Sequence, residues 1–271
     1  MKLSKKVFAL LATTITIASF AADKTYTLTA NQLMARENTM STYWYQTSVE
    51  AKALYLQGYK LATKNLAQII KKHHKKPIAI VLDIDETVLD NSQYQAQNIK
   101  DGTEFSPKTW DEWVQLGKAK AVPGAKEFLR FANKNKVKIF FISNRDGNQV
   151  DITKKNLENE GIPVQSTKSL LFSNLGSKVE RMNSVKKHYD IVMLFGDNIC
   201  DFGDFSKTSM ADREKKLEEV KAEFGDKFII FPNPMYGSFE TTIYKEKNVK
   251  KSAEEKMEVK HNLLKGYKWK Y

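Results

Sequence analysis

Cysteine is nearly absent from this sequence. The 271-residue chain contains a single one, Cys200, so no disulfide can form within the chain and the core alone must hold the fold together. No histidine lies close to Cys200 in the sequence, and we therefore interpret it as a small packed residue and not as a catalytic thiol. No cysteine stands near the amino terminus either, so we expect no lipid anchor.

The sequence also lacks an arginine-rich stripe and any recognisable nucleic-acid-binding motif. Its formal net charge is nevertheless +12. A basic surface attracts anions such as phosphorylated metabolites, nucleic acid or acidic lipid, although a solvated lysine-rich surface is the simpler interpretation. We expect no nucleic-acid partner.

The first 22 residues are typical of a secretory signal. Lysines at positions 2, 5 and 6 precede a short apolar core at 7–17, and Ser19 and Ala21 supply the small residues of a cleavage site. The segment is too short and too polar for a stable membrane span, and a buried N-terminal helix is the alternative. We predict cleavage and export, to the periplasm or out of the cell.

Short apolar runs rich in β-branched residues predict buried strands at 78–83, 138–143, 191–197 and 227–233. Helical patterns cover 31–70, 125–133, 152–160, 178–189 and 212–224. Strands that alternate with helices predict an α/β fold with a mostly parallel sheet flanked by helices. Residues 91–122 interrupt the alternation and predict an insertion over one end of the sheet.

The absence of an internal repeat and of a long linker predicts one compact unit over residues 23–271. We expect its core at about 75–245, and a smaller, mainly helical cap built from 30–72 and 91–122. The charged tail at 246–271 is predicted to be a solvated helix or a frayed end.

Three of the predicted strands end in polar side chains. The first ends at Asp83 with Asp85 beyond it, the second at Ser143 with Asn144 next, and the third at Asp197 with Asp201 beyond it. The carboxyl ends of parallel strands meet at one edge of a sheet, where open α/β folds bind ligands. Residues two apart on an extended chain point the same way, so we expect the four carboxylates to converge. They would need a divalent cation to remain ionised together, and Mg²⁺ suits such a set of oxygen ligands.

This set of side chains predicts phosphoryl transfer. One aspartate beside a cation can act as a nucleophile and form an aspartyl-phosphate, and a second can hold the proton for the leaving oxygen. The transferring oxygens need donors, which the Ser143 hydroxyl and the Lys178 ammonium offer. A single D-x-D is a weak signal, but the conjunction of D-x-D-x-T, S-N-R, a later lysine and G-D-N-x-x-D is specific.

These segments resemble the haloacid dehalogenase superfamily and, within it, the class C bacterial acid phosphatases, which are secreted phosphomonoesterases also active on nucleoside monophosphates. The likeness is carried by "DIDETVLDN" (83–91), "AVPGAKEFL" (121–129), "FISNR" (141–145), "SKVER" (177–181), "GDNICDFGD" (196–204) and "FPNPMYGSFE" (231–240). The "VPGA" and "PNPMYGS" segments narrow the match to the class C group.

The resemblance implies a role for each of these residues. Asp83 would be the nucleophile and a magnesium ligand, and Asp85 the general acid and then base, with its backbone carbonyl on the metal. Asp197 would bind the metal, with Asp201 there directly or through water. The resemblance further implies that Ser143, Asn144 and Lys178 bind the phosphoryl group, that Thr87 and Asn198 support the site, and that Trp110 and Tyr236 clamp a nucleobase.

Two other interpretations stay open from the sequence. A basic, catalytically idle protein could bind anionic or host ligands on the same scaffold, although the intact set of site residues argues against it. A phosphomutase of the same superfamily is the other, and the predicted signal argues against it because sugar-phosphate substrates are normally intracellular. The oligomeric state also stays open, a homodimer included.

Overall fold

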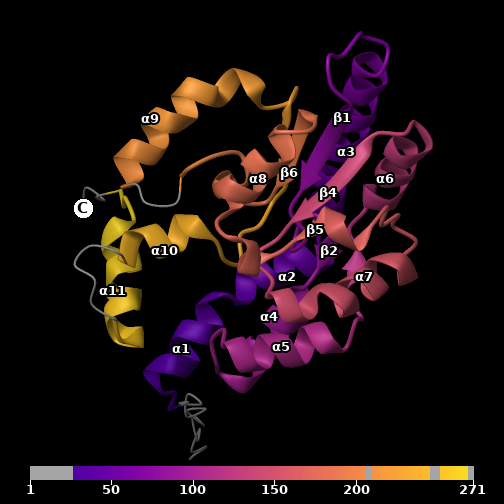
Figure 1. Cartoon of the computed structure of the whole chain (residues 1–271). Helices are drawn as coiled ribbons and strands as arrows, with labels where there is room; N and C mark the ends of the chain where they lie inside the picture. The colour runs from indigo at the N-terminus through magenta and orange to yellow at the C-terminus, as the bar shows by residue number, and fades with distance from the viewer. Residues whose placement is uncertain (1–26, 206–208, 245–250, 268–271) are drawn as a thin grey trace, which may run out of the picture.

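A computed structural model describes residues 27–205, 209–244 and 251–267, so the predicted signal at 1–22 lies outside the described residues. Its centre is a five-stranded parallel sheet in the order β5-β4-β1-β6-β7 (Figure 1). The strands are β1 (Ile78–Leu82), β4 (Lys138–Ile142), β5 (Leu170–Leu171), β6 (Asp190–Gly196) and β7 (Phe228–Ile230). The prediction of a mostly parallel sheet flanked by helices is therefore confirmed.

The side chains of β1 alternate between the two faces of the sheet and pack in two separate hydrophobic cores. Ile80 and Leu82 face the larger core, which α3 (Val49–Ile69), α6 (Ala125–Lys134) and α7 (Val150–Asn159) cover. Ala79 and Val81 face the smaller core, which α8 (Lys178–Lys186) covers. Because both faces of the sheet are buried, β1 is a continuous apolar run.

The predicted helix at 31–70 is three helices: α1 (Ala30–Glu37), α2 (Thr39–Thr47) and α3. The chain turns at Asn38, which ends α1, and again at Ser48, whose side chain accepts a hydrogen bond from Ala51 N and so begins α3. Of these three helices, α1 and α2 pack against α4 (Ser92–Asp101) of the insertion. Helix α3 packs instead against α6 and β7 and belongs to the larger core.

The insertion begins with β2 (Leu89–Asp90) and α4, continues through α5 (Pro107–Gln115) and ends at β3 (Lys120–Ala121). β2 and β3 pair in antiparallel fashion, which closes the insertion at its base. Figure 1 shows α4 and α5 gathered below the sheet with α1 and α2. The insertion thus lies beside the loops that follow the strands.

The chain ends in α9 (Met210–Val220), α10 (Ser238–Tyr244) and α11 (Ala253–Leu263). In the part of the tail that the structure describes, α11 packs on α1, and its Lys256 pairs with Glu104 at 3.1 Å. Within the described ranges, no helix has both the length and the apolar character needed to cross a membrane.

Candidate active site

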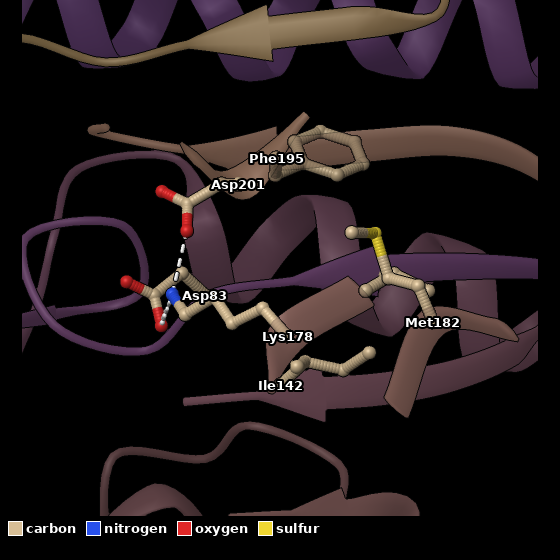
Figure 2. Close-up of a pocket in the computed structure, with 7 residues that line it drawn as sticks. Asp83, Ile142, Lys178, Met182, Phe195 and Asp201 are labelled. Atoms are coloured by element: carbon tan, nitrogen blue, oxygen red, sulfur yellow. Dashed lines mark hydrogen bonds and ion pairs between the residues drawn. The ribbon is translucent and has the colours of Figure 1, made fainter. Parts of the chain in front are cut away.

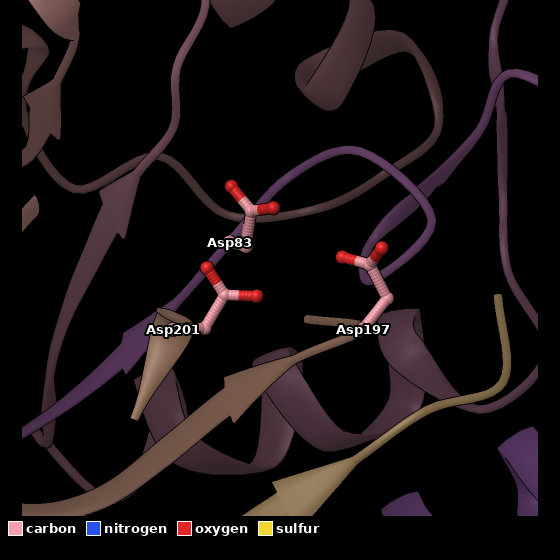
Figure 3. Close-up of side chains that lie close together, drawn as sticks. All are labelled: Asp83, Asp197 and Asp201. Carbon is pink, nitrogen blue, oxygen red and sulfur yellow. The ribbon is translucent and has the colours of Figure 1, made fainter. Parts of the chain in front are cut away.

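Three carboxylates lie together at the carboxyl edge of the sheet. Asp83 follows β1, Asp197 follows β6, and Asp201 ends a short 3₁₀ turn at Ile199–Asp201. One oxygen atom of each lies within 4.8 Å of the others, and Figure 3 shows the three side chains converging from these segments. Strand ends far apart in the sequence therefore meet, as the parallel sheet predicts.

Lys178 lies between two of these carboxylates. Its Nζ is 3.0 Å from Asp83 Oδ1 and 2.5 Å from Asp201 Oδ1 (Figure 2). Lys178 is the first residue of α8, and Ser177 caps the helix. The Ser177 side chain accepts a hydrogen bond from Glu180 N, and the Glu180 side chain accepts one from Ser177 N. The helix start thus fixes the lysine at the site. A small cavity opens there between Asp83, Lys178, Asp201 and four apolar side chains, Val81, Ile142, Met182 and Phe195.

Burial and mutual repulsion raise the pKa of two of the carboxylates. Burial raises the pKa of Asp83 well above its usual value. The charge of Lys178 offsets part of this rise, and the charges of Asp201 and Asp197 add to it. Burial and Asp201 raise the pKa of Asp197 to about 7. Burial would lower the pKa of Lys178, but Asp201 and Asp83 raise it above its usual value. The lysine is therefore charged, and the cluster needs further positive charge to ionise fully.

The donor set fits a hard divalent cation. Asp83 and Asp201 are buried and Asp197 is half-buried, and carboxylate oxygens are the ligands that such ions prefer. Asp197 is also held by neighbours: Asn233 Nδ2 donates to its Oδ2 at 2.8 Å and Thr87 Oγ1 to its Oδ1 at 3.3 Å. Asn198 N donates to Asp201 Oδ2 at 3.0 Å. These contacts orient the carboxylates toward a common point.

The side chain of Asp85 lies outside the three-carboxylate cluster. We expected Asp85 to point the same way as Asp83, but β1 ends at Leu82 and the chain turns, so that the alternation of an extended strand does not apply. Arg145 Nη2 and Nε donate to Asp85 Oδ1 at 2.7 and 3.0 Å. Asn91 Nδ2 donates to the same oxygen at 2.9 Å. Three carboxylates of the predicted four therefore converge, and the fourth, that of Asp85, is held beside them.

The loop after β4 carries the predicted phosphate-binding residues. Ser143 is fully buried; its Oγ accepts from Arg145 N at 3.1 Å and donates to Asp85 Oδ2 at 3.3 Å. The side chain of Asn144 accepts from Arg181 Nη2 at 3.2 Å. Arg181, from α8, also donates to the backbone oxygen of Ser143 at 2.5 Å. Helix α8 therefore fixes this loop as well as Lys178.

The two predicted base-binding aromatic residues have different neighbours near the D-x-D loop. The Trp110 ring, on α5, lies 5.6 Å from Arg145 Cζ and meets the Tyr94 ring edge-on at 5.2 Å. The Tyr236 hydroxyl donates to Glu86 Oε2, and its ring packs against the larger core. The two rings share no stacking contact in the described part of the chain.

Several residues that organise the site were not assigned a role from the sequence. Asn91 is fully buried and connects several of these residues by hydrogen bonds. Its Oδ1 accepts from Trp113 Nε1 at 2.8 Å, and its backbone N donates to Glu86 Oε1 at 2.7 Å. Glu86 has a left-handed backbone with φ of 52°. Arg145 and Asn91 do fall in the "FISNR" and "DIDETVLDN" segments, which is the signal that singles them out.

The model of the haloacid dehalogenase superfamily, subfamily IIIB (acid phosphatase), matches residues 8–239. The chain belongs to this family. The resemblance to the superfamily on which the site residues were assigned is therefore confirmed. Enzymes of this superfamily use a divalent metal, which agrees with the donor set at Asp83, Asp197 and Asp201.

Solved structures of a class C acid phosphatase from Bacillus anthracis are similar to the chain. One is 43% identical, covers 87% of this chain and 99% of its own, and superposes with a TM-score of 0.83. A second, with tungstate bound, is 43% identical, covers 88% and 100%, and has the same TM-score of 0.83.

Two curated plant proteins are more distant. Stem 31 kDa glycoprotein from Glycine max is 31% identical and matches 60% of this chain and 60% of its own length. Acid phosphatase 1 from Solanum lycopersicum is 28% identical and matches 58% and 57%. The chain therefore spans less than two thirds of the length of these relatives.

Proposed function

We propose that this protein is an exported acid phosphatase that hydrolyses phosphomonoesters, including nucleoside monophosphates, with Mg²⁺ at Asp83, Asp197 and Asp201. The observation that carries the proposal is the ion pair of Lys178 with Asp83 and Asp201 inside a cluster of buried carboxylates. A cation-compensated aspartate at a strand end is the arrangement that aspartyl-phosphate chemistry needs. A bound Mg²⁺ would screen the carboxylates and polarise a phosphoryl oxygen.

In the first half of the reaction, an Asp83 carboxylate oxygen attacks phosphorus and the bond from phosphorus to the ester oxygen breaks. Asp85 donates a proton to that leaving oxygen, so the product is a neutral alcohol. Ser143, Asn144 and Lys178 bind the phosphoryl oxygens, and the start of α8 adds the partial positive charge of a helix N-terminus.

In the second half, Asp85 removes a proton from water, and the resulting hydroxide attacks the phosphorus of the aspartyl-phosphate. The bond between Asp83 and phosphorus breaks, which returns the carboxylate and releases phosphate. Asp85 regains the proton it gave in the first half, so the cycle balances. The fork of Arg145 and the amide of Asn91 hold Asp85 in place for both transfers.

The affinity for nucleotides is proposed from Trp110 and Tyr236. Trp110 lies next to Arg145, which contacts the proposed acid, so a base stacked on this ring would lie close to the phosphoryl site. The tungstate bound in the Bacillus anthracis enzyme is an oxyanion, and this supports an anion site here. Export is proposed from residues 1–22 and would place the enzyme in the periplasm or outside the cell.

The test is turnover by the purified full-length protein on aryl, alkyl and nucleoside phosphates. We expect chelation to abolish turnover and added Mg²⁺ to restore it. Asp83→Asn should fold normally and lose turnover on every substrate, whereas Asp226→Asn, an exposed carboxylate at the other edge of the sheet, should keep it. Turnover by metal-stripped protein or by Asp83→Asn would overturn the mechanism. Phosphate binding with no turnover would favour an idle anion-binding protein.

A further inference from the structure

Exposed lysines gather at the amino edge of the sheet, at the opposite end of the strands from the carboxylates. They lie in the segments that lead into β1, β4, β6 and β7: Lys71, Lys72, Lys75, Lys76, Lys134, Lys136, Lys138, Lys186, Lys187 and Lys227. These segments gather at the upper end of the view in Figure 1. The fold therefore concentrates on one face a charge that the sequence spreads over 157 positions, from 71 to 227.

We call the surface formed by these lysines the basic edge. Few acidic side chains lie in the same segments to neutralise its positive charge. None of its lysines forms an ion pair with a carboxylate in the described parts of the chain. The acidic residues of the same segments are Asp190, Glu223 and Asp226. Lys76 Nζ donates to the backbone oxygens of Lys186 and Lys187, at 3.0 and 3.3 Å, so two of the basic loops are fastened together. Like charges held this close favour an external anionic partner.

The composition of the basic edge favours a surface of lipid headgroups over nucleic acid. The edge is built from lysine without arginine, and the two large aromatic residues of its segments, Tyr189 and Phe224, are half-buried against the smaller core, where they are poorly placed to stack on a base. Clustered lysines are attracted to anionic bilayers as point charges without a shaped pocket. The basic edge is formed by the loops that lead into β4, β1, β6 and β7, which are adjacent in the sheet.

The basic edge is also separated from the active site. Residues 71–76 precede β1 and Asp83 follows it, so the five residues of the strand lie between them. At about 3.3 Å per residue this is roughly 17 Å, which exceeds the Debye length at physiological salt. A surface that contacts the amino edge therefore leaves the carboxyl edge open to solution.

We propose that the basic edge docks the protein on an anionic phospholipid surface, with the active site facing away from the membrane. The contact is electrostatic and reversible, and it needs no helix in the bilayer. Each lysine near an anionic bilayer contributes roughly a fivefold factor to partitioning. The proposal does not depend on turnover, because binding and hydrolysis use opposite edges of the sheet.

The experiment is co-sedimentation of the full-length protein with vesicles of phosphatidylcholine containing phosphatidylglycerol, and with pure phosphatidylcholine vesicles. We expect binding to the anionic vesicles only, lost as salt rises. A variant with Lys71→Gln, Lys72→Gln, Lys75→Gln and Lys187→Gln should bind at least tenfold more weakly. A control with Lys52→Gln, Lys100→Gln, Lys118→Gln and Lys215→Gln carries the same net charge and should bind almost as well as the parent.

Three results would overturn the proposal. Equal loss in the two variants would mean that net charge alone drives binding. Tighter binding to duplex DNA than to anionic vesicles at the same salt would indicate a nucleic-acid surface. Release by inorganic phosphate that exceeds release by chloride at equal ionic strength would indicate a discrete phosphate site. Unchanged melting temperatures in both variants ensure that the comparison reports binding and not unfolding.

Discussion

The guanidinium of Arg145 holds the carboxylate of Asp85 by its Nε and Nη2 atoms, 3.0 and 2.7 Å from Oδ1. Arg145 is 2% exposed, and its third nitrogen, Nη1, donates to Thr153 Oγ1 at 2.9 Å. A planar fork fixed at all three nitrogens leaves Asp85 little freedom of orientation. The loop after β4 therefore sets the direction of the proposed acid that follows β1.

Arg145→Lys should lower kcat/KM by about tenfold to a hundredfold, a loss of roughly 1.4–2.8 kcal/mol of transition-state stabilisation. Lysine keeps the positive charge but cannot reproduce the fork. Because Asp85 is the proposed acid for the leaving oxygen, alkyl phosphates, which have poor leaving groups, should lose more than aryl phosphates. Steady-state kinetics on one substrate of each kind measures the difference.

Two further variants serve as comparisons for Arg145→Lys. Asp85→Asn should show the same dependence on the leaving group, with a larger loss. Thr153→Val removes the far contact of Arg145 and leaves the fork to Asp85 in place, so it should affect thermal stability more than the leaving-group dependence. Equal losses on alkyl and aryl phosphates in Arg145→Lys would remove Arg145 from the positioning of the acid.

The convergence of Asp83, Asp197 and Asp201 was predictable from the sequence because its determinants are local. Asp83 and Asp197 each follow an apolar run, and a parallel sheet brings such positions to one edge without any knowledge of strand order. The pairing of Arg145 with Asp85 could not be predicted in this way, because it requires β4 to be the neighbour of β1. The direction of Asp85 depends on a turn with Glu86 in the left-handed region, which residue spacing does not reveal.

The long strands of the fold were predictable from the sequence, whereas short elements and helix breaks were not. Four strands were predicted because each is a distinct apolar run, whereas β5 has only two residues, Leu170 and Leu171, and gives no periodic signal. The helical pattern at 31–70 did not reveal that the helix is interrupted at Asn38 and at Ser48, because both are polar residues that also suit the surface of a continuous helix. The placement of α3 in the core depends on Tyr59, which is 2% exposed and donates its hydroxyl to Thr87 O at 2.6 Å.

The stability of the metal-free protein should fall as the pH rises from about 4 to about 7. The pKa of Asp197 is raised to about 7 in the folded state, and that of Asp83 is raised as well. A raised carboxyl pKa gives stability that is present below the unfolded value near 4 and lost as the pH passes the folded value. We expect a fall of order 4 kcal/mol, or roughly 8–16 °C in melting temperature.

Divalent cation should reverse this fall, because it binds the ionised carboxylates. The rise in melting temperature on adding Mg²⁺ should be larger at pH 7.5 than at about pH 4.5. Asp197→Asn should flatten the dependence on pH and weaken the response to Mg²⁺. A melting temperature that is constant with pH in the presence of chelator would contradict the assigned shifts.

Tyr236→Phe should destabilise the protein by about 1–3 kcal/mol, because it leaves Glu86 Oε2 buried without its donor. Glu86 is fully buried, and burial, Asp85 and Asp197 raise its pKa well above the usual value. KM for a nucleoside monophosphate should stay nearly constant, since phenylalanine retains the ring. Thermal melting and steady-state kinetics separate the two effects.

The control for that substitution is Tyr244→Phe. The Tyr244 hydroxyl donates to Glu240 at 2.9 Å in a less buried position, so its removal should cost less than 0.5 kcal/mol or so. A double-mutant cycle of Tyr236→Phe with Glu86→Gln should give a coupling of about 0.5–3 kcal/mol. Additive effects would show that the Tyr236–Glu86 contact contributes no stability.

Trp110→Ala should raise KM for a nucleoside monophosphate about tenfold or more, which corresponds to roughly 1.4 kcal/mol of lost stacking. KM for a small phosphate ester without a ring should change little. Trp110→Phe keeps an aromatic face and should recover most of the affinity. Phe105→Ala removes the 62% exposed ring whose centroid lies 6.4 Å from that of Trp110, and tests whether any nearby aromatic residue suffices.

The contact of Trp110 with Arg145 gives this experiment a second outcome. If the ring acts by supporting Arg145, and through it Asp85, then Trp110→Ala should lower kcat on both substrates and leave the ratio of their KM values unchanged. That result would make Trp110 a positioning residue for the acid and would remove its assignment to the nucleobase. A rise in KM confined to the nucleotide, in a variant with an unchanged melting temperature, assigns the Trp110 ring to the base.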